Sequence, residues 1–365
     1  MDGQFLASLG QLLGSPQLLL LMLIAVPIGM VFGAVPGLGG KLAIAMMIPF
    51  VFGMDMLEGA VFLVALHAVV HTGGSLPSIL LGIPGTGPDA ATVVDGYPMT
   101  RNGEAGRALG ASLAASGVGG VIGAVTLALL LPVLEPLVLA FGSAEIFMLA
   151  VFGITFVAAL SGDRLREGLI VGLLGLVFAS VGMDPVSGVT RFTFGQLSLW
   201  EGLDLITVVL GLFAVPEMLD MALGREARHS ARLEPIRYRL QEVLACMREV
   251  LRHRWLALRN SVMGAVIGMI PGLGGDVSAW LCYGHAVQSS KTPERFGKGA
   301  VEGVIAPETA NKSKEGGALV PTLFFGVPGS SGMVLLLAGF VMLGITPGPE
   351  LMVKQPGLLW ILVWA

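Results

Sequence analysis

The chain has 365 residues, of which 54% are hydrophobic and only 13% are charged, and its mean hydropathy is +0.83. This composition excludes an ordinary soluble domain, which would need far more polar surface, and it predicts a polytopic membrane protein. The formal net charge of −4 gives little information by itself. Two cysteines, Cys246 and Cys282, provide neither a disulfide framework nor the spacing of a metal motif.

Several segments are nearly free of charge and long enough to cross a hydrocarbon core of about 30 Å as helices. No Lys or Arg precedes the first of them in residues 1–16, and no clean cleavage site follows it, so we expect it to stay in the membrane. Shorter apolar segments are expected at 42–53 and 57–70. The long segments are residues 17–35, 108–131, 143–160, 169–183 and 203–219.

Residues 222–259 form an arginine-rich linker that contains 9 of the 21 basic residues of the chain. Apolar residues recur in it at steps of three and four, which predicts an amphipathic helix on the inner face of a membrane. The positive-inside rule places the linker in the cytoplasm. Glutamates are interspersed among the arginines, and together with the membrane context they argue against a nucleic-acid partner.

The same rule assigns a side of the membrane to the other loops. Counting crossings back from the linker puts residues 162–168 and 97–107 in the cytoplasm, and both loops are basic. The count puts the N-terminus outside, where the lack of basic residues is expected. We therefore predict a periplasmic N-terminus.

Two motifs occur twice in the same order. The stretch GAVPGLGGK at 33–41 returns as GMIPGLGGD at 268–276, which is 235 residues later. The stretch LPSILLGIPGTG at 76–87 returns as VPTLFFGVPGSS at 320–331, which is 244 residues later, and a glycine pair precedes each copy. The first half starts outside and the second follows a cytoplasmic linker, so we predict inverted repeats at 1–221 and 260–365.

Glycine and proline that break apolar segments at matching places of two inverted repeats are typical of a secondary transporter with its site near the membrane midplane. Broken helices expose N–H and C=O groups, which lipid cannot satisfy, so such breaks line a wet cavity or are buried in protein. Helix N-termini at the breaks suit a carboxylate. The predicted substrate contacts are Gly37, Gly39, Gly40, Gly85, Thr86, Gly272, Gly274, Gly275, Gly329 and Ser330.

The glycine-rich stretch at 110–124 has a different interpretation. It lies inside a long apolar segment and carries small residues at regular spacing. Small residues at such a spacing let two helices pack closely, so we predict a helix contact there and no substrate site.

Other candidates flank these motifs. His67 and His71 lie on one helix face at a spacing that would suit a metal ion. Alternatively, the two side chains line the transport pathway, take up protons during transport, or make ordinary hydrogen bonds between helices. No third metal ligand is evident, and we predict no metal site. Lys41 and Asp276 occupy the same position in the two repeats with opposite charge, and buried charges are candidates for function. Asn311 is a possible ion or pathway residue, and Asp89, Asp95 and Glu308 rank below it.

These motifs, with GRALG at 106–110 and APETANKSKEGGALVPTLFFGVPGSSG at 306–332, resemble the large membrane subunit of the tripartite tricarboxylate transporter family, the TctA-like proteins. The resemblance runs through most of the chain. It implies a permease that works with a small four-helix membrane subunit and a periplasmic solute-binding protein, and that imports di- or tricarboxylates with an ion gradient.

Two features differ from the family pattern. Family members extend beyond the end of this chain, which stops within an apolar segment, so we expect a C-terminally truncated second repeat. The positions after PETAN are small in the family, but here they are Lys312, Ser313, Lys314 and Glu315. These charges alter the expected cavity, and a lysine could contribute to a carboxylate site directly.

We therefore predict an all-α, inverted-repeat secondary transporter of the bacterial inner membrane, with discontinuous helices and two re-entrant hairpins at about 73–94 and 316–340. It is expected to be no enzyme and to need no cofactor beyond a coupling ion, Na⁺ or H⁺. Two alternatives stay open: an intramembrane metal-dependent hydrolase that uses His67 and His71, and an uncoupled carboxylate channel. The sequence leaves open the carboxylate, the coupling ion and the oligomeric state.

Overall fold

A computed structural model describes residues 2–36, 38–140, 165–183, 189–203, 246–271 and 273–365, with single positions between 142 and 219. Within this part the chain is helical apart from a small antiparallel sheet of β1 (Gly182–Met183) and β2 (Thr190–Arg191). The all-helical membrane architecture expected from composition is thereby confirmed in its general form. Most of the predicted linker lies outside the described residues.

Long apolar helices identify a multi-pass membrane protein. Helices α2 (Pro16–Ala34), α4 (Met56–Leu81) and α6 (Ala105–Leu139) each contain an apolar stretch long enough to cross a membrane. One face of α6 exposes large apolar side chains four residues apart, which is the surface that lipid would cover. They are Val121, Val125, Leu129 and Val133.

Helices α2 and α4 form the first of two similar helix pairs. Their backbones touch where α2 has glycine, and a Cβ atom built at Gly33 would lie only 1.9 Å from the carbonyl oxygen of Val70. Helix α2 stops at the first Pro-Gly motif and α3 (Gly39–Val51) follows it. Helix α4 ends at Gly82, whose φ of 71° is left-handed, and α5 (Ala90–Arg101) follows a short loop.

Helices α13 (Arg254–Gly268) and α15 (Glu302–Phe325) form the second pair, and their contacts repeat those of the first. A Cβ atom at Gly268 would lie 2.2 Å from the carbonyl oxygen of Lys314. These positions are 235 and 244 residues after Gly33 and Val70, the same offsets as in the motifs. Helix α14 (Gly274–Ser289) follows the second motif, α15 ends at Gly326 with a φ of 66°, and α16 (Ser331–Met342) comes next.

Helices α4 and α15 continue past the glycine pairs at which the hairpins were expected to start. The expected apolar segment ended at residue 70, with hairpins starting at 73 and 316, but α4 and α15 run without interruption to Leu81 and Phe325. The glycine pairs at 73–74 and 316–317 lie inside these helices, where they allow close packing instead of a break. A Cβ atom at Gly73 would lie 2.4 Å from the carbonyl oxygen of Met30.

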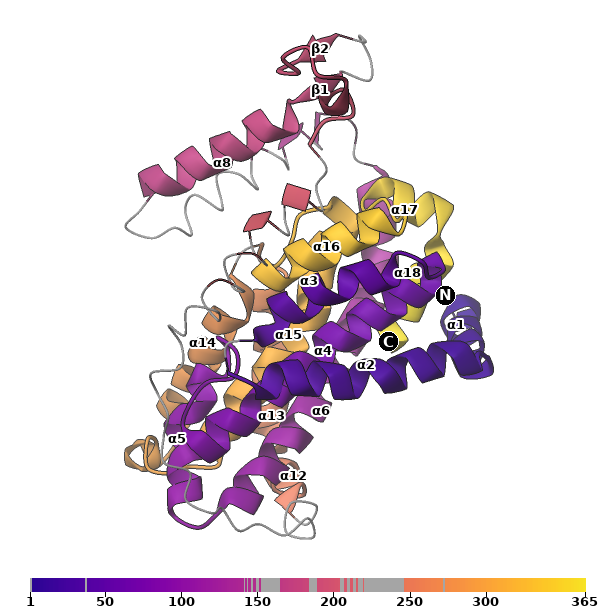
Figure 1. Cartoon of the computed structure of the whole chain (residues 1–365). Helices are drawn as coiled ribbons and strands as arrows, with labels where there is room; N and C mark the ends of the chain where they lie inside the picture. Colours follow the sequence, from indigo (N-terminus) through magenta and orange to yellow (C-terminus); the bar gives the residue numbers. More distant parts are fainter. Residues whose placement is uncertain are drawn as a thin grey trace.

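Helix α15 lies in the middle of the bundle, between α4, α6, α13 and α14 (Figure 1). Almost its whole length is buried, from Gly303 to Phe324. Glycines of α6 make one of its contacts possible, because a Cβ atom at Gly119 would lie 2.3 Å from the carbonyl oxygen of Thr309. Gly123 packs in the same way on Ser313, so the helix contact predicted at 110–124 is confirmed.

Short elements complete the described part. The two ends of the chain lie together, because Phe5 of α1 (Asp2–Gly14) contacts the rings of Trp360 and Trp364 in α18 (Pro356–Trp364). The remaining elements are α8 (Leu165–Ala179), α12 (Glu249–Arg252), α17 (Pro349–Lys354) and the 3₁₀ turns η2 (Leu197–Leu199) and η4 (Pro293–Arg295).

Candidate functional site

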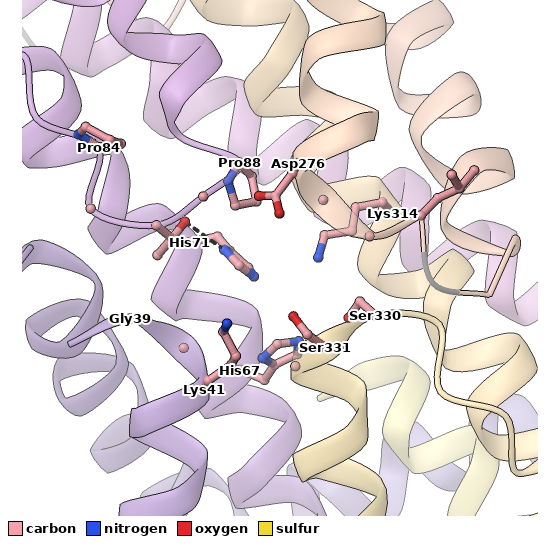
Figure 2. Close-up of a pocket in the computed structure, with 18 residues that line it drawn as sticks. Gly39, Lys41, His67, His71, Pro84, Pro88, Asp276, Lys314, Ser330 and Ser331 are labelled. Atoms are coloured by element: carbon pink, nitrogen blue, oxygen red, sulfur yellow. Dashed lines mark hydrogen bonds between the residues drawn. The ribbon is translucent and has the colours of Figure 1, made fainter. Parts of the chain in front are cut away.

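A cavity of about 370 Å³ lies where the four motifs meet. Figure 2 shows it between α3, α4, the loop after α4, and the N-terminal ends of α14 and α16. Both halves of the chain therefore contribute to one space. It is lined by Gly39, Gly40, Lys41, His67, His71, Pro84, Gly85, Thr86, Gly87, Pro88, Leu273, Gly274, Gly275, Asp276, Lys314, Ser330, Ser331 and Gly332.

Two helices begin at this cavity with glycine in a left-handed conformation. Gly39 opens α3 with a φ of 60°, and Gly274 opens α14 with a φ of 65°. The first N–H groups of a helix have no partner inside the helix and carry the positive end of its dipole. The cavity thus receives two sets of N–H donors, an arrangement suited to an anion.

The loops after α4 and α15 are held by the same hydrogen bonds. The amide of Gly85 donates to Ser78 Oγ at 3.4 Å, and Ser78 Oγ donates to the carbonyl of Gly74 at 2.8 Å. In the second half Gly329 N donates to Thr322 Oγ1 at 3.2 Å, and that hydroxyl donates to the carbonyl of Ala318 at 2.7 Å. One hydroxyl on the last turn of each helix therefore fixes the Pro-Gly loop that follows.

Charged side chains point into the cavity from three different elements. Figure 2 shows Lys41 on α3, Asp276 on α14 and Lys314 on α15 directed toward the same space. Glycines leave room for them, because a Cβ atom at Gly87 would lie 2.2 Å from an Asp276 oxygen. The cavity is polar and holds two ammonium groups, so it can bind an anion with several oxygen atoms.

Behind Lys314, two histidines meet one carboxylate. Glu315 lies 3.1 Å from His67 Nε2 and 3.0 Å from His71 Nε2, and Lys314 Nζ lies 2.6 Å from the Glu315 oxygen that faces His71. The other nitrogen of His71 lies 3.1 Å from the hydroxyl of Thr86. This cluster joins α4, α15 and the first Pro-Gly loop.

The cluster has a spacing that a metal ion could use, because ligand atoms of His67, His71 and Glu315 all lie within 4.8 Å of one another. Its charges oppose that use. The ammonium of Lys314 already pairs with Glu315, and it would repel a divalent cation at the same oxygen. Lys314 and Glu315 therefore form an ion pair beside the two imidazoles, and this arrangement does not fit a metal centre.

A second layer of polar groups lies deeper, around helix α15. The carboxylate of Glu308 is fully buried and accepts hydrogen bonds from hydroxyls on α4, α5 and α6, namely those of Ser75, Thr92 and Ser116. Asn311 donates to buried Asp89 at 3.3 Å, and the ammonium of Lys312 donates to the carbonyl of Ala68. Hydroxyl and amide groups thus satisfy charges that lipid could not.

The structure brings most of the residues predicted from the motifs to one cavity. Gly329 is next to the cavity and Asn311 lies in the deeper layer, in contact with Asp89. Asp95 has a different place, since it accepts hydrogen bonds from the amides of Gly299 and Ala300 at the end of the bundle. Gly37 and Gly272 lie outside the described residues.

The contact of Glu315 with the two histidines was not predicted from the sequence. The repeat offset contains the missing signal, because His71 and Glu315 are 244 residues apart and so occupy equivalent places on α4 and α15. Residues at equivalent places of two crossing helices can face each other, as these do. Ala68 and Lys312 are related in the same way and are also in contact.

A polytopic helical membrane protein with a polar cavity between two similar helix pairs is the class that these observations define. The comparison with protein families agrees, because residues 19–365 match the tripartite tricarboxylate transporter TctA family. This chain belongs to that family, which confirms the resemblance carried by its motifs. The family is one of transporters, in agreement with the prediction of a protein that is not an enzyme.

Two curated relatives come from Agrobacterium vitis. The chain is 32% identical over 337 residues to an uncharacterized 52.8 kDa protein in the TAR-I ttuC' 3' region, a match that covers 92% of this chain and 66% of the relative. It is 38% identical over 97 residues to an uncharacterized protein in the TAR-II ttuC' 3' region, covering 27% of this chain and 40% of that relative. The chain thus spans just under two thirds of the first relative. No solved structure matches it.

Proposed function

We propose that this chain is the large permease subunit of a binding-protein-dependent importer of di- or tricarboxylates in a bacterial inner membrane. The observation that carries the proposal is the cavity between the two halves, where two helix N-termini and the ammonium groups of Lys41 and Lys314 converge. Carboxylates are planar anions whose oxygen atoms accept hydrogen bonds from such donors. Family membership supports the same substrate class.

The proposed architecture is a pair of inverted repeats, at 1–221 and 260–365, that enclose the substrate. Glycine contacts that recur at offsets of 235 and 244 residues support the repeats. The positive-inside rule supports their opposite directions, with a periplasmic N-terminus and a cytoplasmic linker at 222–259. The two Pro-Gly loops, centred on Gly85 and Gly329, take the place of the expected hairpin tips.

The proposed mechanism is alternating access around this one cavity. The substrate carboxylates contact the glycines at the starts of α3 and α14 and the hydroxyls of Thr86 and Ser330. One helix pair then moves against the other and opens the cavity to the opposite side. An ion gradient, of Na⁺ or H⁺, supplies the free energy. A small four-helix membrane subunit and a periplasmic solute-binding protein complete the transporter.

The first test uses single cysteines placed at Thr86 and at Ser330 in the full-length subunit. Citrate and a panel of other carboxylates should protect both cysteines from a water-soluble maleimide, because both side chains line the proposed site. A cysteine at Lys291 is the control, because this exposed residue lies in the polar stretch 289–298 and not in the cavity lining, so the reagent should reach it with or without substrate. Equal labelling with and without every carboxylate would contradict the proposed site.

The second test is uptake of the same radiolabelled carboxylates into proteoliposomes that contain both partner proteins. We expect accumulation against a concentration gradient when an ion gradient is imposed. Equilibration without accumulation would instead favour an uncoupled channel.

A further inference from the structure

A row of polar groups in close contact runs along the cavity wall, where His71 and Thr86 line the cavity. Its first member is Glu315, which lies 3.0 Å from His71 Nε2. His71 Nδ1 lies 3.1 Å from Thr86 Oγ1, and that hydroxyl lies 2.5 Å from a carboxylate oxygen of Asp89. Asp89 is fully buried, and the amides of Thr86 and Asn311 also donate to it. The row joins α4, α15 and the Pro-Gly loop.

The number of protons in this row can be counted. The hydrogen bond from Thr86 to Asp89 and the one between His71 and Thr86 each need one proton. The 3.0 Å approach of His71 Nε2 to a Glu315 oxygen is a close contact, and it needs a third proton because the lone pair of an unprotonated nitrogen would be repelled by the carboxylate. The hydroxyl of Thr86 and a neutral imidazole supply only two protons. The row is therefore complete only when it holds one further, titratable proton.

A count of charges in the same region gives the same number. Three buried carboxylates, those of Asp89, Glu308 and Glu315, lie around two buried ammonium groups, those of Lys312 and Lys314. Burial of an uncompensated charge is costly, and one added proton removes the excess negative charge. The charge count, which shares Asp89 and Glu315 with the proton count, thus agrees with it.

We propose that the row from Glu315 through His71 and Thr86 to Asp89 is the binding site of the coupling ion, and that this ion is a proton. The inference rests on the proposed function, because it names the ion that drives carboxylate import through the same cavity. A proton fits between atoms that are already in contact, whereas Na⁺ needs its own coordination space and would meet the ammonium groups of Lys312 and Lys314.

Proton movement along the row needs no other reactant. In one state Asp89 is protonated and donates to Thr86, which donates to His71 Nδ1, while His71 Nε2–H faces ionised Glu315. When Asp89 loses its proton to the Thr86 oxygen, Thr86 passes its own proton to Nδ1 and the imidazole becomes an imidazolium. Transfer of the Nε2 proton to Glu315 then returns a neutral ring. Each step breaks one O–H or N–H bond and forms another.

Charged groups beside the row also line the cavity, so substrate binding can affect protonation of the row. From α4, His67 Nε2 faces Glu315 at 3.1 Å, and from α15, Lys314 Nζ lies 2.6 Å from it. Lys314 also lines the cavity with Lys41 of α3 and Asp276 of α14. A bound carboxylate attracts Lys314 and leaves Glu315 with less compensation, so it favours uptake of a proton. By reciprocity, a bound proton favours the carboxylate.

The deciding experiment follows protons and carboxylate together in proteoliposomes that contain the full-length subunit, its partner proteins and a trapped pH dye. The membrane potential is clamped at zero, and citrate or succinate is added at a pH where all of its carboxyl groups are ionised. We expect entry to acidify the lumen. Each unit of imposed pH gradient should raise accumulation about tenfold for each proton carried, and a Na⁺ gradient should have no effect.

Variants separate coupling from folding. Asp89→Asn keeps a polar side chain outside the cavity lining but cannot take up the proton, so gradient-driven accumulation should fall about tenfold or more, while exchange of labelled for unlabelled carboxylate continues. His71→Gln, in the cavity wall, should also lose gradient-driven accumulation. Retained exchange demonstrates a folded protein. His253→Gln is the matched control, because His253 also lies beside a carboxylate, 3.9 Å from Glu302, but away from the cavity. It should accumulate carboxylate like the unchanged protein.

Two results would overturn the inference and are distinguishable from each other. Accumulation driven by Na⁺ without acidification of the lumen would leave the proposed function standing and remove the proton site. Absence of flux with every carboxylate would remove both. Measuring lumen acidification and carboxylate accumulation with the unchanged protein identifies the coupling ion even if a variant loses exchange.

Discussion

The two central helices, α4 and α15, share their backbone contacts but differ in the side chains they carry. Both pack against a glycine-bearing helix, both end at a left-handed glycine and both hold the next loop with one hydroxyl. Helix α15 buries Glu308, Lys312, Lys314 and Glu315, whereas the described part of α4 buries two histidines as its titratable groups. The backbone geometry of the proposed anion site is therefore present in both halves, whereas α15 carries buried charged side chains that α4 lacks.

The close helix contacts that the two pairs share can be tested by adding a methyl group at the contact glycines. Gly33→Ala and Gly268→Ala place a methyl group 1.9 and 2.2 Å from a backbone carbonyl, so each should destabilise the protein by about 3 kcal/mol or more. Gly117→Ala meets nothing within 4 Å and is the control. Thermal unfolding in detergent, followed by the amount of monodisperse protein, measures the effect. If only one of the two glycines mattered, the two helix pairs would not be equivalent.

The difference in charge between the two halves can be tested at Lys41 and Asp276, which occupy equivalent positions in the cavity. Lys41→Gln removes an ammonium group that can bind the substrate, at a loss of about 1.5–3 kcal/mol, or roughly ten- to a hundredfold in affinity. Asp276→Asn removes a negative charge from the same cavity and should instead strengthen binding. The concentration dependence of carboxylate uptake measures both. Weaker binding in Asp276→Asn would mean that this carboxylate positions a donor for the substrate.

The loop hydroxyls give a smaller and symmetrical effect. Ser78→Ala and Thr322→Val each remove the hydroxyl that accepts from the following loop amide, and each should lower stability by about 0.5–1.5 kcal/mol. Because the two hydroxyls share no partner, their effects should add in the double variant. The free energy of unfolding in detergent is the measurement. Ser180→Ala, on the exposed end of α8, serves as the control and should change little.

The smallest effect concerns the contact between Arg107 at the start of α6 and Glu249 of the linker. Arg107 donates to Glu249 at 2.8 Å, and this hydrogen bond lowers the pKa of the Glu249 carboxyl below its ordinary value of 4.5. A lowered pKa contributes stability above the ordinary value, and that contribution is lost as the pH falls through the lowered one. Glu249→Gln should cost about 0.2–1 kcal/mol at neutral pH and flatten the acid side of the stability profile. An unchanged profile would show that the pair contributes nothing.

Site residues could be predicted from the sequence where their role depends on backbone conformation. Repeated glycine and proline positions identified Gly39, Gly85, Gly274 and Ser330, because breaks in apolar helices leave a strong local pattern. The apolar segment expected at 57–70 is shorter than α4, since a glycine pair inside a helix looks like a break until the neighbouring helix is known. Glu315 was missed because its partners lie on another helix. Side-chain pairing across a bundle has no local signature.

The buried charges of α15 also affect how the chain enters the membrane during synthesis. A charged residue at the centre of an inserting helix costs about 2.5–3.5 kcal/mol, so α15 cannot partition into lipid as an isolated segment. The groups that compensate it lie on α4, α5 and α6, which the ribosome produces earlier. We therefore expect the helices of the first half to be in the membrane before α15 inserts.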